Sequence, residues 1–178
     1  MTVTCESLAA ELRRLQASEQ IRQRVYGFSR ALDRLDRDLL AAQFWPDAEV
    51  DYGQFYRGPI AGFLDVAMQF QGAMRDTQHL VGNISIEVSG ECASSESYVH
   101  AYHVLSQGSE LVQLQVGARY LDKLTCRGVE WRISFRTEVM DWGRWLPIPD
   151  RWFENSQDMP KGIRGLDDLS YRYLRTVP

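Results

Sequence analysis

Apolar residues recur every three or four positions near the start of the chain. Between Ile21 and Leu39 they stand at positions 21, 25, 28, 32, 35 and 39. This spacing places them along one face of a helix, because an α-helix completes a turn in about 3.6 residues. We therefore predict a long amphipathic helix over 21–39. A less complete version of the same pattern predicts a weaker helix over 6–15.

The helical spacing stops at Pro46 and returns later in the chain. Residues around Val50 predict a short strand. The Gly-Pro pair that ends at Pro59 predicts a turn into a helix, because proline suits the first helical position. Residues 60–74 again carry apolar residues at steps of three and four, and they predict a second long helix.

After His79 the apolar period changes from helical spacing to two. Such alternation is typical of strands, whose successive side chains point to opposite faces of a sheet. Segments that contain glycine and serine separate the alternating stretches and suit hairpin turns. The pattern predicts four strands, at about 81–88, 93–105, 111–124 and 129–142.

The chain has 178 residues, which is long enough for one substantial hydrophobic core. Helices followed by an antiparallel meander are typical of an α+β domain. We expect this domain over 1–145, with an N-terminal helical extension. Residues 146–178 carry three prolines before a helix-like piece over 166–174. Because this tail is rich in aromatic residues, we expect it to pack on the domain or on a neighbouring subunit.

Charge and cysteine content narrow the class of partner. The formal net charge is −4 with scattered lysines and arginines, which argues against a nucleic-acid or anionic-membrane surface. A basic leader and a long apolar run are both missing from the sequence, so we expect a cytoplasmic protein. The three cysteines are widely spaced and form no metal-binding motif, which predicts free thiols and no metal site. A small molecule or another protein is the expected partner.

One edge of the helix over 21–39 is polar and aromatic, and it leaves two interpretations open. In the first, its aspartates form surface pairs with arginines three and four positions away. In the second, Asp33 is partly buried and faces a cavity between helix and sheet, where its carboxylate needs a partner. The residues on this edge are Tyr26, Ser29, Asp33 and Asp36.

His79 is the natural partner for a buried Asp33. A carboxylate bonded to one ring nitrogen fixes the tautomer, leaves the other nitrogen as a base, and stabilises the imidazolium that forms. The alternative is that His79, a lone histidine beside a strand, is a structural residue with satisfied hydrogen bonds. The segments around this pair also contain aromatic residues that suit the lining of an apolar cavity. They are Phe28, Trp45, Tyr52, Phe55, Tyr56, Phe63 and Phe70.

Three segments together resemble the SnoaL-like branch of the NTF2-like superfamily. They are "YGFSRALDRLDRDLLAAQFWPDAEVDY", "TQHLVGNISIEV" and "VEWRISFRTEVMDW". The resemblance covers about 18–142. It implies an α+β cone in which N-terminal helices pack on a strongly curved mixed β-sheet and enclose an apolar pocket. The branch includes scytalone dehydratase, bile-acid dehydratase and hexachlorocyclohexane dehydrochlorinase.

The resemblance also implies roles for individual residues. Asp33 and His79 match the aspartate and histidine with which these lyases take a proton from carbon, without a cofactor. An arginine on the last strand often closes the site, which indicates Arg132 or, preferably, Arg136. Where the dehydratases often carry a tyrosine, five positions before the aspartate, this chain has Phe28, so the acid is unassigned. The substrate-binding residues that we expect are Tyr26, Phe28, Trp45, Tyr52, Tyr102 and Arg136.

We therefore predict a cofactor-independent lyase that acts on a hydrophobic cyclic or aromatic small molecule through an Asp33–His79 dyad. Dehydration is the simplest reaction, and loss of another small group, isomerisation or epoxide hydrolysis stays open. The alternative is a non-catalytic subunit or ligand-binding module, such as a small subunit of an aromatic-ring dioxygenase. We expect a homodimer or homotrimer, because a curved sheet leaves a broad outer face and large apolar patches are usually covered.

Overall fold

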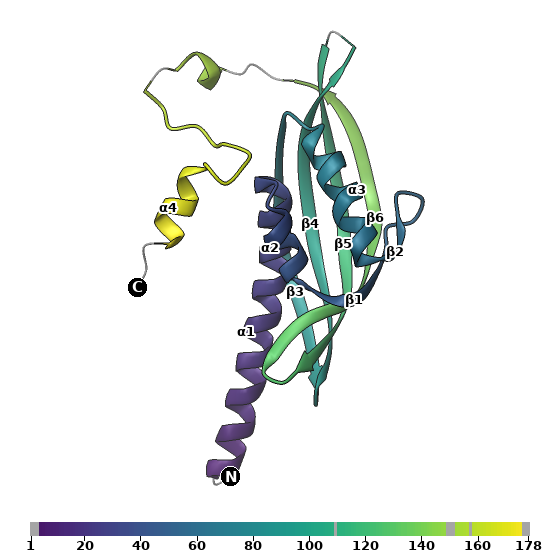
Figure 1. Cartoon of the computed structure of the whole chain (residues 1–178), viewed down its shortest axis with the longest axis vertical. Helices are drawn as coiled ribbons and strands as arrows, with labels where there is room; N and C mark the ends of the chain where they lie inside the picture. Colours follow the sequence, from purple (N-terminus) through teal and green to yellow (C-terminus); the bar gives the residue numbers. More distant parts are fainter. Residues whose placement is uncertain (1–3, 109, 149–151, 157, 176–178) are drawn as a thin grey trace.

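One curved β-sheet and the helices on its inner side make up the body of the molecule (Figure 1). The computed structural model describes residues 4–108, 110–148, 152–156 and 158–175. The helices are α1 (Cys5–Arg34), α2 (Arg37–Ala42), α3 (Ile60–Gly72), the 3-10 helix η1 (Trp152–Asn155) and α4 (Leu169–Arg175). The strands are β1 (Phe44–Asp51), β2 (Arg57–Pro59), β3 (Asp76–Ser89), β4 (Cys92–Gln107), β5 (Glu110–Arg127) and β6 (Glu130–Pro147).

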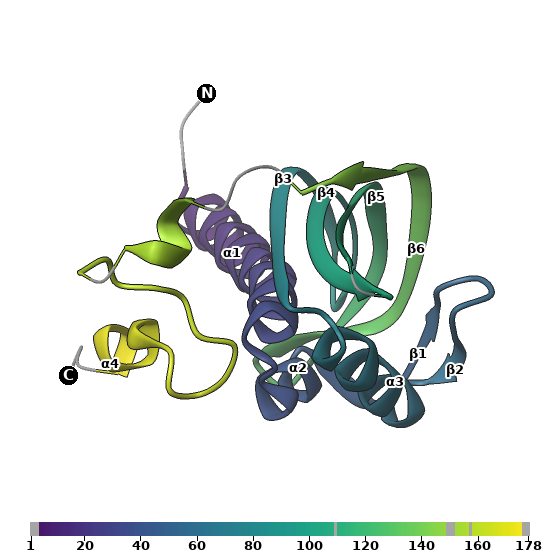
Figure 2. The same ribbon diagram turned by 90° about the horizontal axis from the view of Figure 1, so that it is seen from above.

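The sheet is mixed and its strands follow the order β2-β1-β6-β5-β4-β3. Strands β3 to β6 form an antiparallel meander, whereas β1 lies parallel to β6 and antiparallel to β2. The β5–β6 ladder has register shifts between Gly117 and Ala118 and between Lys123 and Leu124. Such bulges bend a strand and increase its twist. Seen from above, the sheet curls towards α1 and α3 (Figure 2), and the predicted α+β architecture is confirmed.

The first helix begins earlier and ends earlier than predicted. A capping box starts α1 at Cys5, so the segment predicted over 6–15 belongs to the same helix. The prediction of one helix over 21–39 is wrong at its end, because Leu35 adopts a left-handed conformation with φ 52°. The Asp36 side chain then accepts a hydrogen bond from the Leu39 N–H at 2.9 Å and begins α2. The apolar spacing continues across the break because Leu39 packs against the same core.

Strand β3 forms one edge of the sheet and pairs only with β4. It begins at Asp76 rather than near residue 81, so His79 lies inside the strand. Helix α1 packs against β3 and runs along that side of the sheet (Figure 1). An open sheet edge carries unpaired backbone groups, and a covering helix masks them. This contact between α1 and β3 holds the predicted aspartate and histidine.

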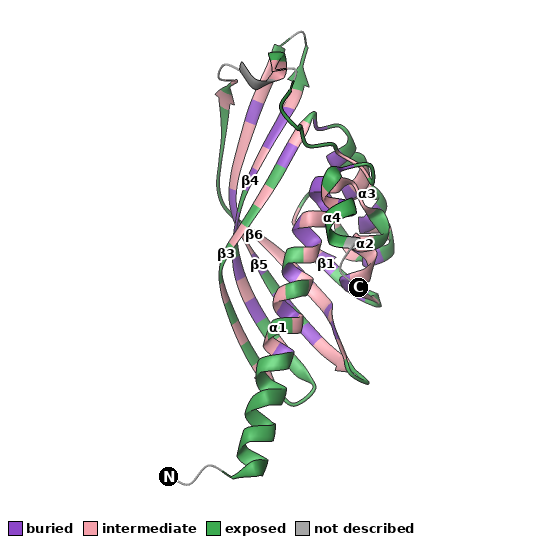
Figure 3. Cartoon of the chain, turned by 90° about the vertical axis from the view of Figure 1, so that its left-hand side faces the viewer, coloured by how far each residue is buried: buried purple, intermediate pink, exposed green. Residues whose placement is uncertain are grey.

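The hydrophobic core lies between the inner face of the sheet and helices α1, α2 and α3. Buried positions gather on the facing sides of these elements, whereas the N-terminal part of α1 is exposed (Figure 3). In the part of the chain that the structure describes, no helix is both long and apolar enough to cross a membrane. The largest fully buried apolar side chains include Ile21, Phe28, Leu40, Phe44, Phe63, Leu124 and Ile133.

The C-terminal tail contacts the ends of α1 and α3 through Arg164. Carbonyls in the last turn of a helix have no partner within that helix, and the Arg164 guanidinium donates hydrogen bonds to several of them. A second contact joins α4 to the helix pair, since the Tyr171 hydroxyl donates to the Asp36 carboxylate at 2.7 Å. The carbonyls that Arg164 contacts belong to Leu32 (3.4 Å), Asp33 (3.5 Å), Gln71 (2.5 Å) and Met74 (2.6 Å).

Replacing Arg164 with alanine is expected to lower the free energy of unfolding by about 1.5–3 kcal/mol, the range for hydrogen bonds from a charged group. The half-buried carbonyls at the ends of α1 and α3 lose their charged donor in this variant. Urea denaturation followed by circular dichroism measures the change. Arg13→Ala is the matched control, because Arg13 is exposed on the protruding part of α1. Equal midpoints for the two variants would contradict the role of Arg164.

Candidate active site

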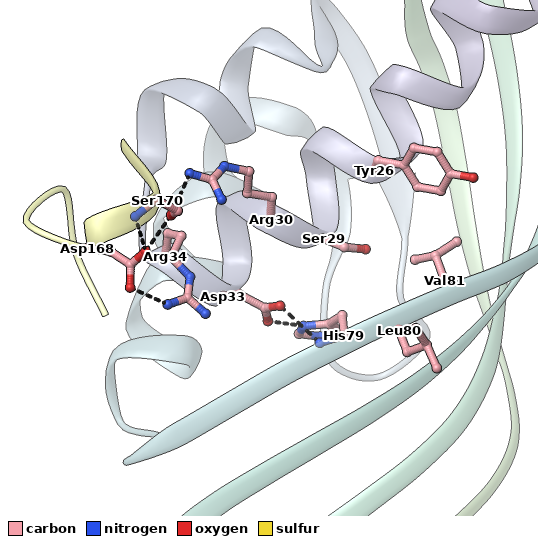
Figure 4. Close-up of a pocket in the computed structure, with 10 residues that line it drawn as sticks. All are labelled: Tyr26, Ser29, Arg30, Asp33, Arg34, His79, Leu80, Val81, Asp168 and Ser170. Atoms are coloured by element: carbon pink, nitrogen blue, oxygen red, sulfur yellow. Dashed lines mark hydrogen bonds and ion pairs between the residues drawn. The ribbon is translucent and has the colours of Figure 1, made fainter. Parts of the chain in front are cut away.

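Asp33 and His79 face each other across the contact between α1 and β3 (Figure 4). The His79 Nδ1 atom lies 2.7 Å from Asp33 Oδ1, and the His79 backbone N–H donates to Asp33 Oδ2 at 3.1 Å. Both side chains are buried, with 5% of the His79 side chain and 11% of the Asp33 side chain exposed. One carboxylate therefore holds both the backbone and the imidazole of the same residue.

Local structure explains why these two side chains meet. Asp33 lies in the last turn of α1, one turn after Ser29 on the side of the helix that packs against β3. His79 lies on an edge strand, and its N–H points away from β4 towards the covering helix. The Asp33 carboxylate thus satisfies an edge N–H that the sheet leaves unpaired.

The geometry determines which ring nitrogen of His79 is free. An ionised carboxylate only accepts hydrogen bonds, so the Nδ1 atom beside Asp33 carries the proton. The Nε2 atom is then unprotonated and is the basic atom of the ring. A proton taken up at Nε2 creates an imidazolium, which the Asp33 charge stabilises. The arrangement therefore suits His79 to general-base chemistry.

A cavity of about 450 Å³ opens beside His79 between the sheet and the helices. Its walls are mainly apolar and aromatic. Phe55 and Phe70 lie in edge contact, with ring centroids 5.0 Å apart, and are 42% and 36% exposed, so they mark the mouth of the cavity. Fully buried Phe28 and Phe63 lie at its inner end. The cavity thus provides an apolar space with the imidazole of His79 in its wall.

His103 is a second imidazole in the same wall. Its ring centroid lies 5.3 Å from that of His79, and its Nδ1 atom lies 2.7 Å from the Thr77 hydroxyl. Burial lowers the pKa of His103 to about 4, and the nearby charges of His79 and Arg164 act in the same direction. His103 is therefore neutral at neutral pH and does not compete with His79 for the Asp33 charge.

Glu138 on β6 is the carboxyl group of the cavity wall. It pairs in register with Tyr120 of β5, which also lines the cavity. Burial raises the pKa of Glu138, and the charges of His79 and Arg136 oppose this effect only in part. The protonated carboxylic acid is thus favoured over a wider pH range than in an ordinary glutamate.

A buried ion pair lies below the floor of the cavity. Arg136 and Asp122, both with fully buried side chains, form two hydrogen bonds of 2.6 and 2.7 Å. The guanidinium is packed between the rings of Phe28 and Tyr120, at 4.1 and 4.3 Å from their centroids. Among the described residues, neither its Nη1 atom nor the nearby hydroxyl of Tyr52 has a hydrogen-bond partner. Arg136 therefore supports the cavity from below and does not line it.

A second pocket of about 520 Å³ lies on the other side of the dyad, between α1, β3 and the tail (Figure 4). Its walls include the charged side chains of Arg30, Arg34 and Asp168. Arg34 donates to Asp168 at 3.1 Å, so part of its charge is already neutralised. We take the inner cavity as the candidate site, because enclosed apolar walls with a few polar groups are typical of small-molecule sites.

The sequence model of the SnoaL-like domain matches residues 13–137, more than half of the chain. The chain belongs to the SnoaL-like domain family. No curated protein matches it. Its fold is the NTF2-like α+β fold of a set of solved structures that share 18–24% sequence identity with it.

Three of those structures illustrate the likeness. A hexachlorocyclohexane dehydrochlorinase (LinA) type 2 has a TM-score of 0.70 at 24% identity, covering 79% of this chain and 98% of that chain. A candidate scytalone dehydratase from Novosphingobium aromaticivorans has a TM-score of 0.68 at 20% identity, covering 77% and 92%. An NTF2-like protein with a cystatin-like fold, from the same species, has a TM-score of 0.61 at 18% identity, covering 79% and 92%.

The SnoaL-like domain brings some of the predicted site residues together and separates others. Phe28 and Tyr52 line the inner cavity together with His79, and Asp33 lies directly behind the imidazole. Tyr26 is 43% exposed and lines the outer pocket instead. Asp36 does not belong to the polar edge predicted around Tyr26, because it caps α2 beyond the end of α1.

Trp45 and Tyr102 also lie away from the cavity, so their predicted role in substrate binding requires correction, as does that of Arg136. The Trp45 indole N–H donates to the Thr125 carbonyl at 3.1 Å, and Arg127 stacks on its ring at 4.6 Å. Tyr102 lies between Ala101 and His103, which are both buried towards the inside, so alternation turns Tyr102 to the outer face of the sheet. The aromatic content of these segments therefore did not indicate which face each ring occupies.

Sequence reasoning missed Asp122, His103 and Glu138. Period-two alternation was the available signal for Glu138, since it follows Arg136 by two positions and shares a strand face with it. For Asp122 no local signal existed, because its partner Arg136 is set by the register of β5 against β6. His103 lies within the strand predicted over 93–105, where alternation alone does not tell which face lies inside.

Proposed function

We propose that this SnoaL-like protein is a cofactor-independent lyase that eliminates water or a similar small group from a hydrophobic cyclic or aromatic molecule. The observation that carries the proposal is the His79 imidazole in the wall of an apolar cavity, held at Nδ1 by buried Asp33 at 2.7 Å. This arrangement supports proton removal from carbon at a position shielded from bulk water.

The proposed reaction uses His79 as general base. The Nε2 atom accepts a proton from a carbon next to an electron-withdrawing group of the bound molecule. The electron pair of the broken C–H bond forms a carbon–carbon double bond as the leaving group departs. Asp33 keeps the ring in the reactive tautomer and stabilises the imidazolium, which requires neither a metal ion nor an organic cofactor.

The cavity supports the proposed substrate class. A volume of about 450 Å³ falls within the range of small-molecule sites, roughly 300–1,000 Å³. Aromatic walls at its mouth and inner end favour a flat or cyclic apolar molecule. Two structures of the same fold carry names that denote eliminations, a dehydratase and a dehydrochlorinase, which agrees with the proposal.

The experiment is a turnover assay of the purified chain on a panel of hydroxylated steroids, aryl-propane diols and cyclic β-hydroxy ketones. Absorbance of the newly conjugated double bond reports elimination, and a chelator is present throughout. Turnover of one compound by the wild type, lost in the His79→Ala variant, would support the proposal. Absence of turnover across the panel would favour the alternative of a non-catalytic subunit or ligand-binding module.

We also propose that the protein forms a homodimer or homotrimer through the outer face of its sheet. Exposed apolar residues on this face include Leu80, Tyr98 and Trp142, which are 66%, 48% and 47% exposed and border one shallow hollow. Clustered apolar surface of this kind is usually covered by another protein surface. Light scattering during size-exclusion chromatography measures the mass of the assembly.

A further inference from the structure

Glu138 is a carboxyl group in the cavity wall, and the proposed elimination by His79 and Asp33 assigns it no role. Its partly buried side chain lines the same cavity as His79. Among the described residues, no side chain or backbone group forms a hydrogen bond or ion pair with its carboxyl group. A carboxylate in an apolar cavity without a partner is unfavourable, so this environment favours the protonated acid.

We propose that Glu138 is the general acid of the reaction, and that it protonates a hydroxyl leaving group while His79 removes the proton from carbon. The inference rests on the proposed lyase function and narrows its substrate class. The substrate is an alcohol whose hydroxyl lies one carbon away from an acidic C–H, such as a β-hydroxy carbonyl compound. Without protonation hydroxide is a poor leaving group, whereas a halide leaves readily without help.

The other ionisable groups around Glu138 are poor proton donors. Burial raises the pKa of Tyr52 and of Tyr120 far above the usual tyrosine value, so both phenols hold their protons tightly. His103 is neutral above about pH 4, and a neutral imidazole is a very weak acid. Arg136 is bound to Asp122 and stays charged. Glu138 is therefore the group whose proton is both available and replaceable.

The step balances in protons and electrons. The C–H bond breaks and its proton binds to Nε2 of His79. The electron pair forms the new double bond, and the C–O bond breaks as the oxygen accepts the Glu138 proton. Water leaves, and the site then holds an imidazolium and a carboxylate. One proton transfer from His79 back to Glu138, directly or through a water molecule, restores the starting state.

Leaving-group dependence tests the assignment. Two substrates share one carbon skeleton and one acidic C–H, and they differ in a hydroxyl or a chloride as leaving group. Glu138→Gln, which keeps size and polarity but lacks the acid, is expected to lose at least about a hundredfold in kcat/KM on the alcohol. On the chloride, the kcat/KM of this variant is expected to stay close to the wild-type value. Glu138→Asp, which keeps an acid, is expected to recover part of the activity on the alcohol.

The His79→Ala variant separates this inference from the proposed function. It is expected to lose activity on both substrates, because both require the base. If His79→Ala retained activity on both, the proposed lyase mechanism would fail whatever Glu138 does. If Glu138→Gln lost activity on both substrates equally, or on neither, the assignment of His79 as base would be unaffected and the assignment of Glu138 as acid would be overturned. Glu49→Gln, an exposed glutamate on β1, is the matched control and leaves both rates unchanged.

The pH profile provides a second readout that a structural role would not change. The acid must be protonated to act, so wild-type kcat/KM on the alcohol is expected to fall as pH rises through the raised pKa of Glu138. The groups that face Glu138 and influence this fall are His79, His103, Tyr52, Tyr120 and Arg136. No such fall in kcat/KM is expected for the wild type on the chloride or for Glu138→Gln on the alcohol. A fall that persisted in Glu138→Gln would refute the assignment.

Discussion

Replacing Asp33 with asparagine is expected to reduce kcat/KM for the elimination at least about a hundredfold, the loss associated with a disabled general base. The reason is a change of tautomer. The His79 backbone N–H always donates, so it requires the amide oxygen of the new side chain, which now occupies the place of Oδ2. The amide NH₂ then faces Nδ1, and the proton of the imidazole moves to Nε2. The imidazole ring is still present, but its Nε2 atom now carries the proton and no longer acts as a base.

His79→Ala removes the base itself and is expected to lose at least as much. Single-turnover and steady-state assays on a substrate from the panel measure both variants. His100→Ala is the matched control, because that imidazole lies on the outer face of the sheet beside Trp142, with ring centroids 5.5 Å apart. Activity that survived in both Asp33→Asn and His79→Ala, with fold intact by circular dichroism, would mean that the histidine is structural.

The second large effect concerns stability rather than chemistry. Asp122→Ala is expected to lower the free energy of unfolding by about 3–5 kcal/mol, because it leaves the Arg136 guanidinium charged, buried and unpaired. The two rings that enclose the guanidinium attract the cation, but they do not replace the hydrogen bonds that its N–H groups donate to the Asp122 carboxylate. Chemical denaturation of the variant, compared with the wild type, measures the change.

Two further variants test whether the uncompensated charge is the cause. The double variant Asp122→Leu with Arg136→Met replaces both partners by apolar groups, and it is expected to recover much of the lost stability. Asp47→Ala breaks the exposed pair with Arg127, which is open to water, and is expected to change the denaturation midpoint little. A double variant as unstable as Asp122→Ala alone would indicate that packing, and not charge, holds this region together.

Hydrophobic periodicity was sufficient to predict the long helices and the strands of the meander. Spacing of three and four identified the helices, and alternation identified the strands, because each pattern reports which side of an element faces a core. Periodicity failed at Leu35, where the chain changes direction while its apolar residues keep their spacing. A local left-handed residue and the cap at Asp36 leave no trace in the apolar pattern.

The family, the α+β fold and the choice of Asp33 and His79 as candidate residues came from the sequence alone, since local motifs and their order along the chain carry that information. The tertiary structure decided which side chains meet. Strand register paired Asp122 with Arg136, whose guanidinium is buried behind the rings of Phe28 and Tyr120, and sheet curvature brought Glu138 into the same cavity as His79. These contacts join residues far apart in the chain, and their geometry depends on how the strands align and bend, which no local pattern encodes.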